Sequence, residues 1–243
     1  MGAADEKELG RAIGELASGR ADGSGLRRAG SLASSSMRSA GARSVGTGRW
    51  LADAVLDAAP HVPVRDLATL SAHHGGIDGA ELAAALIRSA SRTTAGLGAV
   101  AGALAGAEEL VPPAWLAIPA ELVVETLAVV AVEMKLVAEL QAVFGHPVVG
   151  TPAERGVAVA KAWAEGRGVT TAILAAPGGV GEALGRTARR EVSRLIQRRL
   201  ARRAMRSLAT LAPFMAGAVA GAELNRRATR RLGDSVVRDL AAR

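Results

Sequence analysis

Arginine and glutamate are the residues whose type and spacing could do chemistry in this chain of 243 residues. Seven arginines are spaced by four residues or lie next to such a series: Arg190, Arg194, Arg198, Arg199, Arg202, Arg203 and Arg206. Since four residues advance an α-helix by about 400°, this spacing predicts a helix with a cationic ridge. A parallel apolar series runs from Ala188 to Leu208. We therefore expect these arginines to bind an anionic surface beside an apolar one.

A group of carboxylates is the second candidate for chemistry. Glu121 and Glu125 share one face of a predicted helix, Glu133 and Glu139 follow, and Lys135 is spaced to pair with Glu139. Such carboxylates could hold a metal, but a two-metal helical bundle also uses Glu-x-x-His pairs, and no histidine occurs in this stretch. We interpret the glutamates as a polar stripe or as ion-pair partners of the C-terminal arginines, and we expect no metal site and no cofactor.

Sequence motifs of the common enzyme classes are missing. Gly96 and Gly98 are not followed by the third glycine of a dinucleotide-binding turn, and residues 178–181 lack the Gly-Lys-Ser/Thr ending of a phosphate loop. No nucleophile elbow and no supported Ser-His-Asp arrangement is found. The absence of cysteine excludes disulfides, thiol catalysis and cysteine metal sites. We expect a protein that is not an enzyme and has no catalytic residues.

Composition predicts an all-α fold. Hydrophobic residues make up 49% of the chain but aromatic residues only 2%, so alanine, leucine and other small side chains must form the core. Alanine and leucine favour helices, whereas a sheet would use more β-branched and aromatic residues. The N-terminus lacks the apolar core of a secretory signal. The longest uncharged runs, at 93–107, 168–181 and 207–222, are shorter than the roughly 18–20 residues of a spanning helix.

Breaking residues divide the chain into predicted elements. Residues 1–48 are rich in glycine, serine and arginine and are expected to be a flexible N-terminal segment, apart from a short charged helix at 4–18. Residues 49–243 are expected to form a single helical domain. A helical hairpin over 80–144, interrupted at Pro112-Pro113, is expected at its centre. Further helices are predicted at 152–166, 182–208 and 213–241. The fold class is thus a helical bundle around a Gly/Ala-rich hairpin.

Three glycines in the first half of that hairpin are spaced by four residues, namely Gly98, Gly102 and Gly106. Small residues at this spacing form a ridge that permits close contact between helices, in lipid or in protein. The sequence leaves open whether 93–107 and 207–222 insert in lipid or pack in a soluble core.

The charge of the chain is concentrated at its C-terminal end. The net charge is +7, but residues 186–243 carry +11 and residues 1–185 carry −4. This asymmetry predicts a contact with an anionic partner, which we expect to be a membrane surface or a membrane protein. Nucleic acid is the lesser expectation, because no aromatic stacking platform accompanies the charge. The alternative is a soluble cytoplasmic scaffold or nucleic-acid-binding protein that uses the same arginines.

The run LATLAPFMAGAVAGAELNRRATRRLGDSVVRDL adds a family resemblance. An apolar helix there contains a proline and a Gly-x-x-x-Gly motif, and an asparagine and a short basic helix follow it. The residues that carry this pattern are Pro213, Gly217, Gly221, Asn225, Thr229 and Gly233. Together with the Gly/Ala-rich hairpin, this pattern resembles the EcsC family over about residues 80–240, in an actinobacterial-type form. The resemblance implies a helical, membrane-associated bacterial protein on the cytoplasmic side of the membrane, peripheral or shallowly inserted. It implies no catalytic residues.

Overall fold

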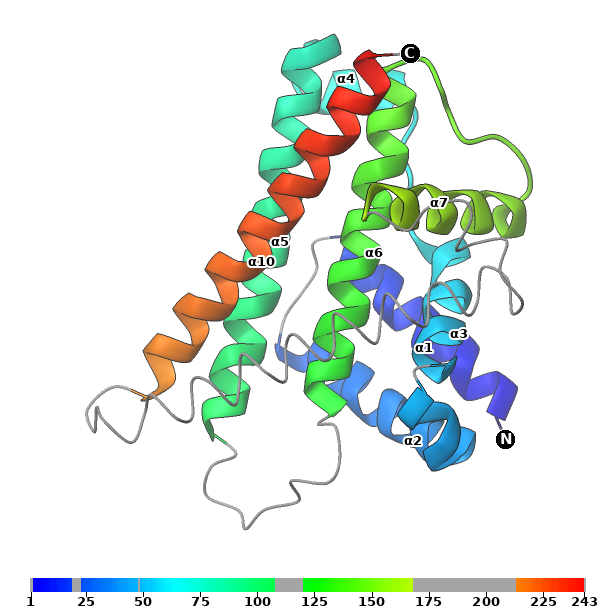
Figure 1. Ribbon diagram of the computed structural model, residues 1–243, viewed down its shortest axis with the longest axis vertical. Coiled ribbons are helices and arrows are strands. Elements are labelled where there is room, and N and C mark those ends of the chain that lie inside the picture. Colours follow the sequence, from blue (N-terminus) through cyan, green and yellow to red (C-terminus); the bar gives the residue numbers. More distant parts are fainter. Residues whose placement is uncertain (1, 19–22, 48, 108–119, 168–212, 243) are drawn as a thin grey trace.

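Helix is the only regular secondary structure in the described part of the chain, which confirms the predicted all-α class. The structure is a computed structural model that describes residues 2–18, 23–47, 49–107, 120–167 and 213–242. These residues form the following elements: α1 (Gly2–Ala17), α2 (Gly23–Thr47), α3 (Arg49–Ala58), the 3-10 helix η1 (Ala59–His61), α4 (Leu67–His73), α5 (Gly79–Ala107), α6 (Ala120–Val143), α7 (Pro152–Gly166) and α10 (Pro213–Ala241) (Figure 1).

Helix α6 forms the centre of the bundle. Its sequence is apolar on nearly every face, and a helix of this kind is stable in water only when other elements surround it. Every described residue from Val123 to Ala128 is buried, and burial continues to Leu140 with few interruptions. Helices α1, α2, α3, α5, α7 and α10 all pack against it.

The predicted hairpin is confirmed as α5 and α6, which pack against each other. Helix α10 makes its most extensive contact with α5 and runs antiparallel to it, while α7 crosses α6 (Figure 1). The predicted bounds 152–166 and 213–241 agree with α7 and α10, whereas the helix predicted at 182–208 lies outside the described residues. No helix among those described combines the length and the hydropathy needed to cross a bilayer.

A capping box explains where α7 begins. The hydroxyl of Thr151 accepts a hydrogen bond from the backbone N–H of Glu154 at 3.4 Å, and the Glu154 carboxylate accepts one from the N–H of Thr151 at 2.8 Å. This exchange satisfies two donors that a helix start leaves free. The intervening Pro152 has the backbone angle of a first helical residue and needs no N–H partner.

Within residues 1–48, α1 agrees with the short charged helix predicted there, whereas α2 corrects the flexible segment expected after that helix. The buried side chains Leu26, Ala29 and Ala33 place α2 in the same core as α1 and α6. The indole N–H of Trp50 donates to the hydroxyl of Ser36 at 2.9 Å and joins α3 to α2. Glycine and serine have low helix propensity, but these tertiary contacts hold α2 in place.

Candidate functional site

The close crossing of α5 and α10 builds the candidate site. A Cβ atom at Gly98 would lie 2.6 Å from the carbonyl oxygen of Gly221, and a Cβ at Gly221 would lie 2.4 Å from that of Gly98. The backbones can approach this closely because neither residue has a side chain. Gly98, the first glycine of the predicted ridge, thus lies where the backbone of α5 comes close to that of α10.

Asn225 follows this crossing by one helical turn. Its side-chain amide donates to Oε1 of Glu125 on α6 at 2.9 Å, and the asparagine is buried. The other residues of the predicted structural motif are helical: Gly102 and Gly106 in α5, and Pro213 and Gly217 in α10. These four residues belong to stretches of α5 and α10 whose side-chain surroundings the structure does not describe.

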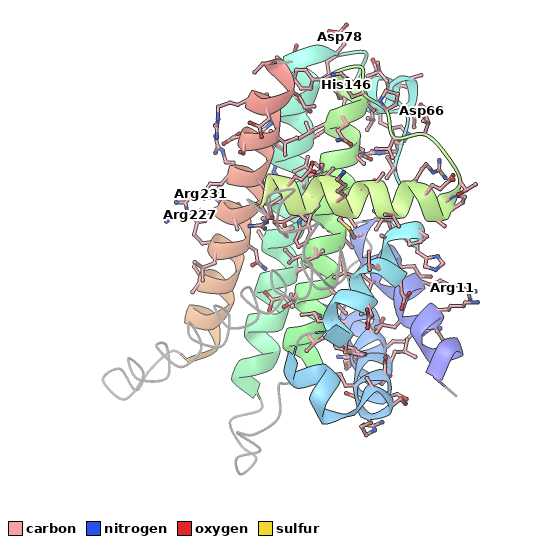
Figure 2. The ribbon with its side chains drawn as sticks, turned by 45° about the vertical axis from the view of Figure 1, so that its right-hand side comes forward. Arg11, Asp66, Asp78, His146, Arg227 and Arg231 are labelled. Atoms are coloured by element: carbon pink, nitrogen blue, oxygen red, sulfur yellow. The ribbon has the colours of Figure 1, made fainter. Side chains whose placement is uncertain are left out.

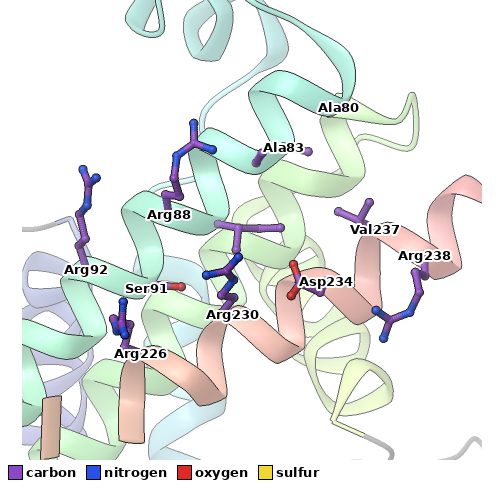
Figure 3. Close-up of a pocket in the computed structure, with 12 residues that line it drawn as sticks. Ala80, Ala83, Arg88, Ser91, Arg92, Arg226, Arg230, Asp234, Val237 and Arg238 are labelled. Carbon is purple, nitrogen blue, oxygen red and sulfur yellow. The ribbon is translucent and has the colours of Figure 1, made fainter. Parts of the chain in front are cut away.

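An open groove of about 570 Å³ lies between α5 and α10, beyond the crossing. Its charged lining residues come from both helices (Figure 3): Arg88, Arg92, Arg226, Arg230, Asp234 and Arg238. All five arginines are exposed. Small apolar side chains, among them Ala83 and Val237, line the other end of the groove, where Arg238 is the charged residue beside Val237 (Figure 3). The groove therefore combines a strongly cationic part with an apolar part.

Local ion pairing neutralises only part of this charge. Glu223 on α10 binds Arg226, with Nε to Oε2 at 2.8 Å, and also binds Arg227. The hydrogen bonds from Arg226 and Arg227 lower the pKa of Glu223 to about 2. The spacing of Asp234 relative to Arg230 also suggests a pair, but no ion pair joins these two described residues. Within the described chain, Arg88, Arg92, Arg230 and Arg238 have no acidic partner.

Ser91 lies between the arginines of the two helices in the view of Figure 3. Its side chain is buried, with 5% of the residue exposed, and its Oγ has no hydrogen-bond partner among the described residues. Buried hydroxyl groups are normally paired. Ser91, Arg88 and Arg92 were not singled out from the sequence. The spacing of the two arginines on one face of α5 was the available signal, but only the fold brings them to α10.

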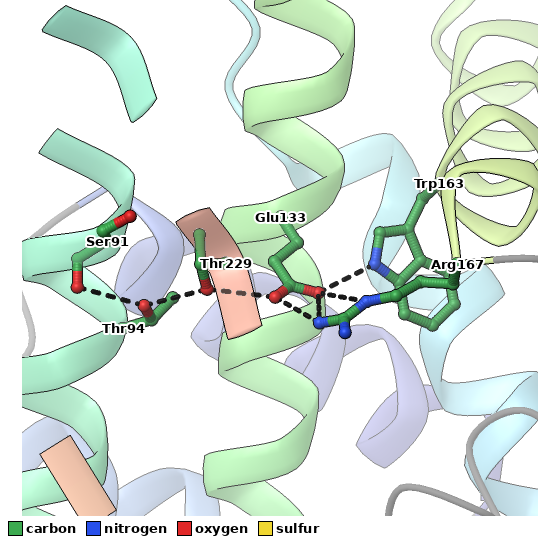
Figure 4. A network of polar contacts seen from close by, with 6 residues as sticks. All are labelled: Ser91, Thr94, Glu133, Trp163, Arg167 and Thr229. Atoms are coloured by element: carbon green, nitrogen blue, oxygen red, sulfur yellow. Dashed lines mark hydrogen bonds and ion pairs between the residues drawn. The ribbon is translucent and has the colours of Figure 1, made fainter. Parts of the chain in front are cut away.

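A buried polar network lies behind the groove (Figure 4). Oε1 of Glu133 on α6 accepts a hydrogen bond from Thr229 of α10 at 3.0 Å, and the Thr229 oxygen lies 3.0 Å from Oγ1 of Thr94 on α5. Oε2 accepts from the indole N–H of Trp163 at 3.0 Å, and the guanidinium of Arg167 pairs with both oxygens. This carboxylate is fully buried. It therefore joins α7 and α10 to α6 directly and α5 through Thr229, and it is not open to substrate.

The third buried glutamate of α6 is Glu139, which receives two hydrogen bonds from the Arg65 guanidinium, at 2.8 and 3.0 Å. These bonds raise the pKa of Arg65. Burial lowers the pKa of nearby Lys135, and the charge of Glu139 opposes this effect. Glu139 is thus paired with Arg65 and Glu133 with Arg167, and neither of these arginines belongs to the predicted C-terminal series. The arginines from Arg190 to Arg206, which were expected as partners, lie outside the described residues.

The predicted anion-binding arginines, Arg190 to Arg206, lie outside the described residues, and so does the side chain of Glu121. The described residues hold no group of three or more histidine, aspartate or glutamate side chains placed to bind a metal ion. Within the described chain, the cationic groove is a concave site that brings together several arginines without an acidic partner and the unpaired hydroxyl of Ser91.

The chain was compared with protein-family models, with curated proteins and with solved structures, and none of the three comparisons finds a significant match.

Proposed function

We propose that this protein is a non-enzymatic, membrane-associated helical protein that docks on an anionic membrane surface. The observation that carries the proposal is the exposed arginine face of α5 and α10. Seven exposed arginines contribute to it: Arg88, Arg92, Arg226, Arg227, Arg230, Arg231 and Arg238. Basic surfaces attract the anionic lipids of a cytoplasmic leaflet by about 1 kcal/mol per arginine or lysine.

The spacing of these arginines costs stability in the free protein. Arg88 and Arg92 are four residues apart on α5, and Arg226 and Arg230 are four apart on α10. Like charges at this spacing destabilise a helix by roughly 0.2–0.5 kcal/mol per pair. An anionic surface outside the protein would remove that penalty, which favours a role for these residues in binding.

The predicted arginines from Arg190 to Arg206 immediately precede α10 in the sequence. We propose that they bind the same anionic partner as the arginines of α5 and α10. The EcsC-like pattern and a position on the cytoplasmic side of the membrane, peripheral or shallowly inserted, belong to the same proposal. A membrane protein with an acidic surface is the other partner that this charge would fit.

Cell fractionation tests this proposal. We expect the protein in the membrane fraction, with release by a high-salt wash, because screening weakens contacts between exposed charges. Resistance to both salt and carbonate would instead indicate insertion of an apolar segment. Protein found only in the cytosol, or released from membranes by nuclease, would contradict the proposal and favour the soluble scaffold or nucleic-acid-binding alternative.

A further inference from the structure

The groove between α5 and α10 has chemical features that general attraction to a charged surface does not require. A flat array of arginines would be sufficient for electrostatic docking. This face instead has a hollow of about 570 Å³, which is within the usual size range of small-molecule sites. A specific group that enters the groove would explain its shape.

Ser91 identifies the part of the groove where a polar ligand would bind. Its Oγ is buried and has no hydrogen-bond partner within the described chain. An unpaired buried hydroxyl carries a desolvation penalty, which a bound acceptor would offset. The hydroxyl can donate one hydrogen bond to an anionic oxygen. The neighbouring hydroxyls Thr94 and Thr229 are already engaged with each other or with other partners.

The arginines around Ser91 determine the kind of acceptor. Arg88 and Arg92 come from α5, and Arg226 and Arg230 come from α10 (Figure 3). Guanidinium groups present several N–H donors in one plane, a geometry that matches the oxygens of phosphate. An anion held beside Ser91 could therefore be bound from both walls of the groove at once.

The opposite end of the groove has a different character. Because α5 and α10 are antiparallel, Ala80 and Ala83 near the start of α5 lie at the same end as Val237 and Arg238 of α10 (Figure 3). This end is less cationic than the part around Ser91 and carries the small apolar side chains of the lining. Asp234 lies between this end and Arg230 along α10. Its charge would direct an anion toward Ser91, while the apolar end suits carbon atoms attached to that anion. The lining thus fits a phosphate group carried on an apolar body.

We infer that the groove binds the phosphate group of an anionic phospholipid headgroup, with Ser91 and the arginines of both walls as its ligands. This inference rests on the proposed function, because the membrane supplies the ligand. It goes further by making the contact selective for phosphate chemistry rather than for negative charge alone.

The test compares two kinds of vesicle with the same zeta potential. One contains phosphatidylglycerol in phosphatidylcholine, and the other contains dioleoylglycerol succinate, whose anionic headgroup is a carboxylate. We expect the full chain to bind the phosphatidylglycerol vesicles roughly three- to tenfold more tightly, the factor that corresponds to about one extra net hydrogen bond.

Two variants and a matched control locate this preference. Ser91→Ala, which leaves the charge unchanged, should weaken binding to phosphatidylglycerol vesicles by roughly two- to tenfold. Arg226→Gln/Arg230→Gln should remove the preference. The control, Arg227→Gln/Arg231→Gln, removes the same charge from the same helix, and its arginines do not line the groove and project outward from α10 (Figure 2). Each double variant also removes one of the two partners of Glu223. The control should weaken binding to both vesicles equally and keep the preference.

The outcomes separate this inference from the proposed function. Equal binding to both vesicles, unchanged by Ser91→Ala, would overturn the phosphate site and leave membrane docking intact. Binding to neither vesicle would contradict both. Soluble glycerol phosphate that binds in a Ser91-dependent manner, without any vesicle preference, would overturn the assignment to a lipid. Thermal unfolding checks that each variant is folded, and Arg88→Gln/Arg92→Gln provides the same test from the α5 wall.

Discussion

At the scale of single residues, Gly98 and Gly221 determine how closely α5 and α10 approach. A Cβ at Gly98 would collide with backbone atoms of α10, which cannot move without shifting the helix. We expect Gly98→Ala to lower the free energy of unfolding by about 1–3 kcal/mol, as overpacking does in a core.

Gly96 is the control for this prediction. It is exposed on the same helix, and a Cβ there would have no atom within 4 Å. Gly96→Ala should therefore raise the free energy of unfolding by about 0.5–1 kcal/mol, because alanine favours a helix over glycine. Urea denaturation of both variants measures the difference. Equal effects would show that α5 and α10 are not in close contact at Gly98.

Glu133 is the buried charge on which the internal network depends. Glu133→Gln removes the buried negative charge that faces Arg167, and it replaces one carboxylate oxygen that accepts hydrogen bonds in the network by an amide group that cannot accept them. Breaking a buried pair from one side costs about 3 kcal/mol or more, and we expect a decrease of this size in the free energy of unfolding. Glu165→Gln, an exposed position on α7, should change it little. A Glu133→Gln variant as stable as this control would argue against the network.

Glu223 gives the chain a pH dependence whose sign is determined by its pKa. The pKa falls from an ordinary value of 4.5 to about 2, chiefly through the hydrogen bond from Arg226 and then that from Arg227. A depressed folded-state pKa means that the carboxylate stabilises the fold above pH 4.5 and loses this effect as the pH falls toward 2. An NMR titration of the Glu223 carboxyl should show the low pKa, and Arg226→Gln/Arg227→Gln should raise it. A titration that does not change in this variant would contradict the pairing.

At the scale of elements, α2 holds the N-terminal part of the bundle against α6. Ala33 is fully buried in this contact, so Ala33→Asp should lower the free energy of unfolding by about 3–5 kcal/mol through an unpaired buried charge. Ser31→Asp, on the exposed side of the same helix, should change it by less than about 0.5 kcal/mol. Equal, small effects would restore the interpretation of 1–48 as a flexible segment.

Local signals explain which elements were predictable. Pro152 after Thr151 marks the first turn of α7, and Pro213 marks that of α10, so these bounds follow from backbone chemistry alone. Helix α2 was missed because its glycines and serines resemble a linker. Its apolar signal was present in the helical spacing of Leu26, Ala29 and Ala33, but alanine contributes little to a hydrophobic pattern.

The site was less predictable than the helices. Gly98 could be identified from the four-residue spacing of its glycine series, and Gly221 and Asn225 from the Gly-x-x-x-Gly pattern that is followed by an asparagine. The groove could not be inferred, because Arg88 and Arg230 are distant in sequence and only the pairing of α5 with α10 brings them together. The partners of Glu133 and Glu139 could not be inferred for the same reason. Glu133 meets Arg167 only because α7 packs on α6, and Glu139 meets Arg65 only because the segment before α4 does.

At the scale of the whole molecule, one face of the bundle is cationic, and the three glutamates of α6 whose side chains the structure describes are enclosed. The buried carboxylates hold elements together, whereas the exposed arginines of α5 and α10 face outward with few acidic partners. We assign the binding role to the arginine face because its charges are exposed, whereas the buried carboxylates are used to hold the helices together. It predicts that binding depends on ionic strength while the fold does not.

The most direct test of that assignment is flotation of the full chain with vesicles of phosphatidylcholine alone and with vesicles that also contain phosphatidylglycerol. We predict binding only to the anionic vesicles at about 0.1 M salt, and release at about 1 M salt, where the screening length falls from about 10 Å to about 3 Å. Circular dichroism should remain unchanged between the two conditions. Equal binding to both vesicles, or no binding to the anionic ones at low salt, would contradict the account.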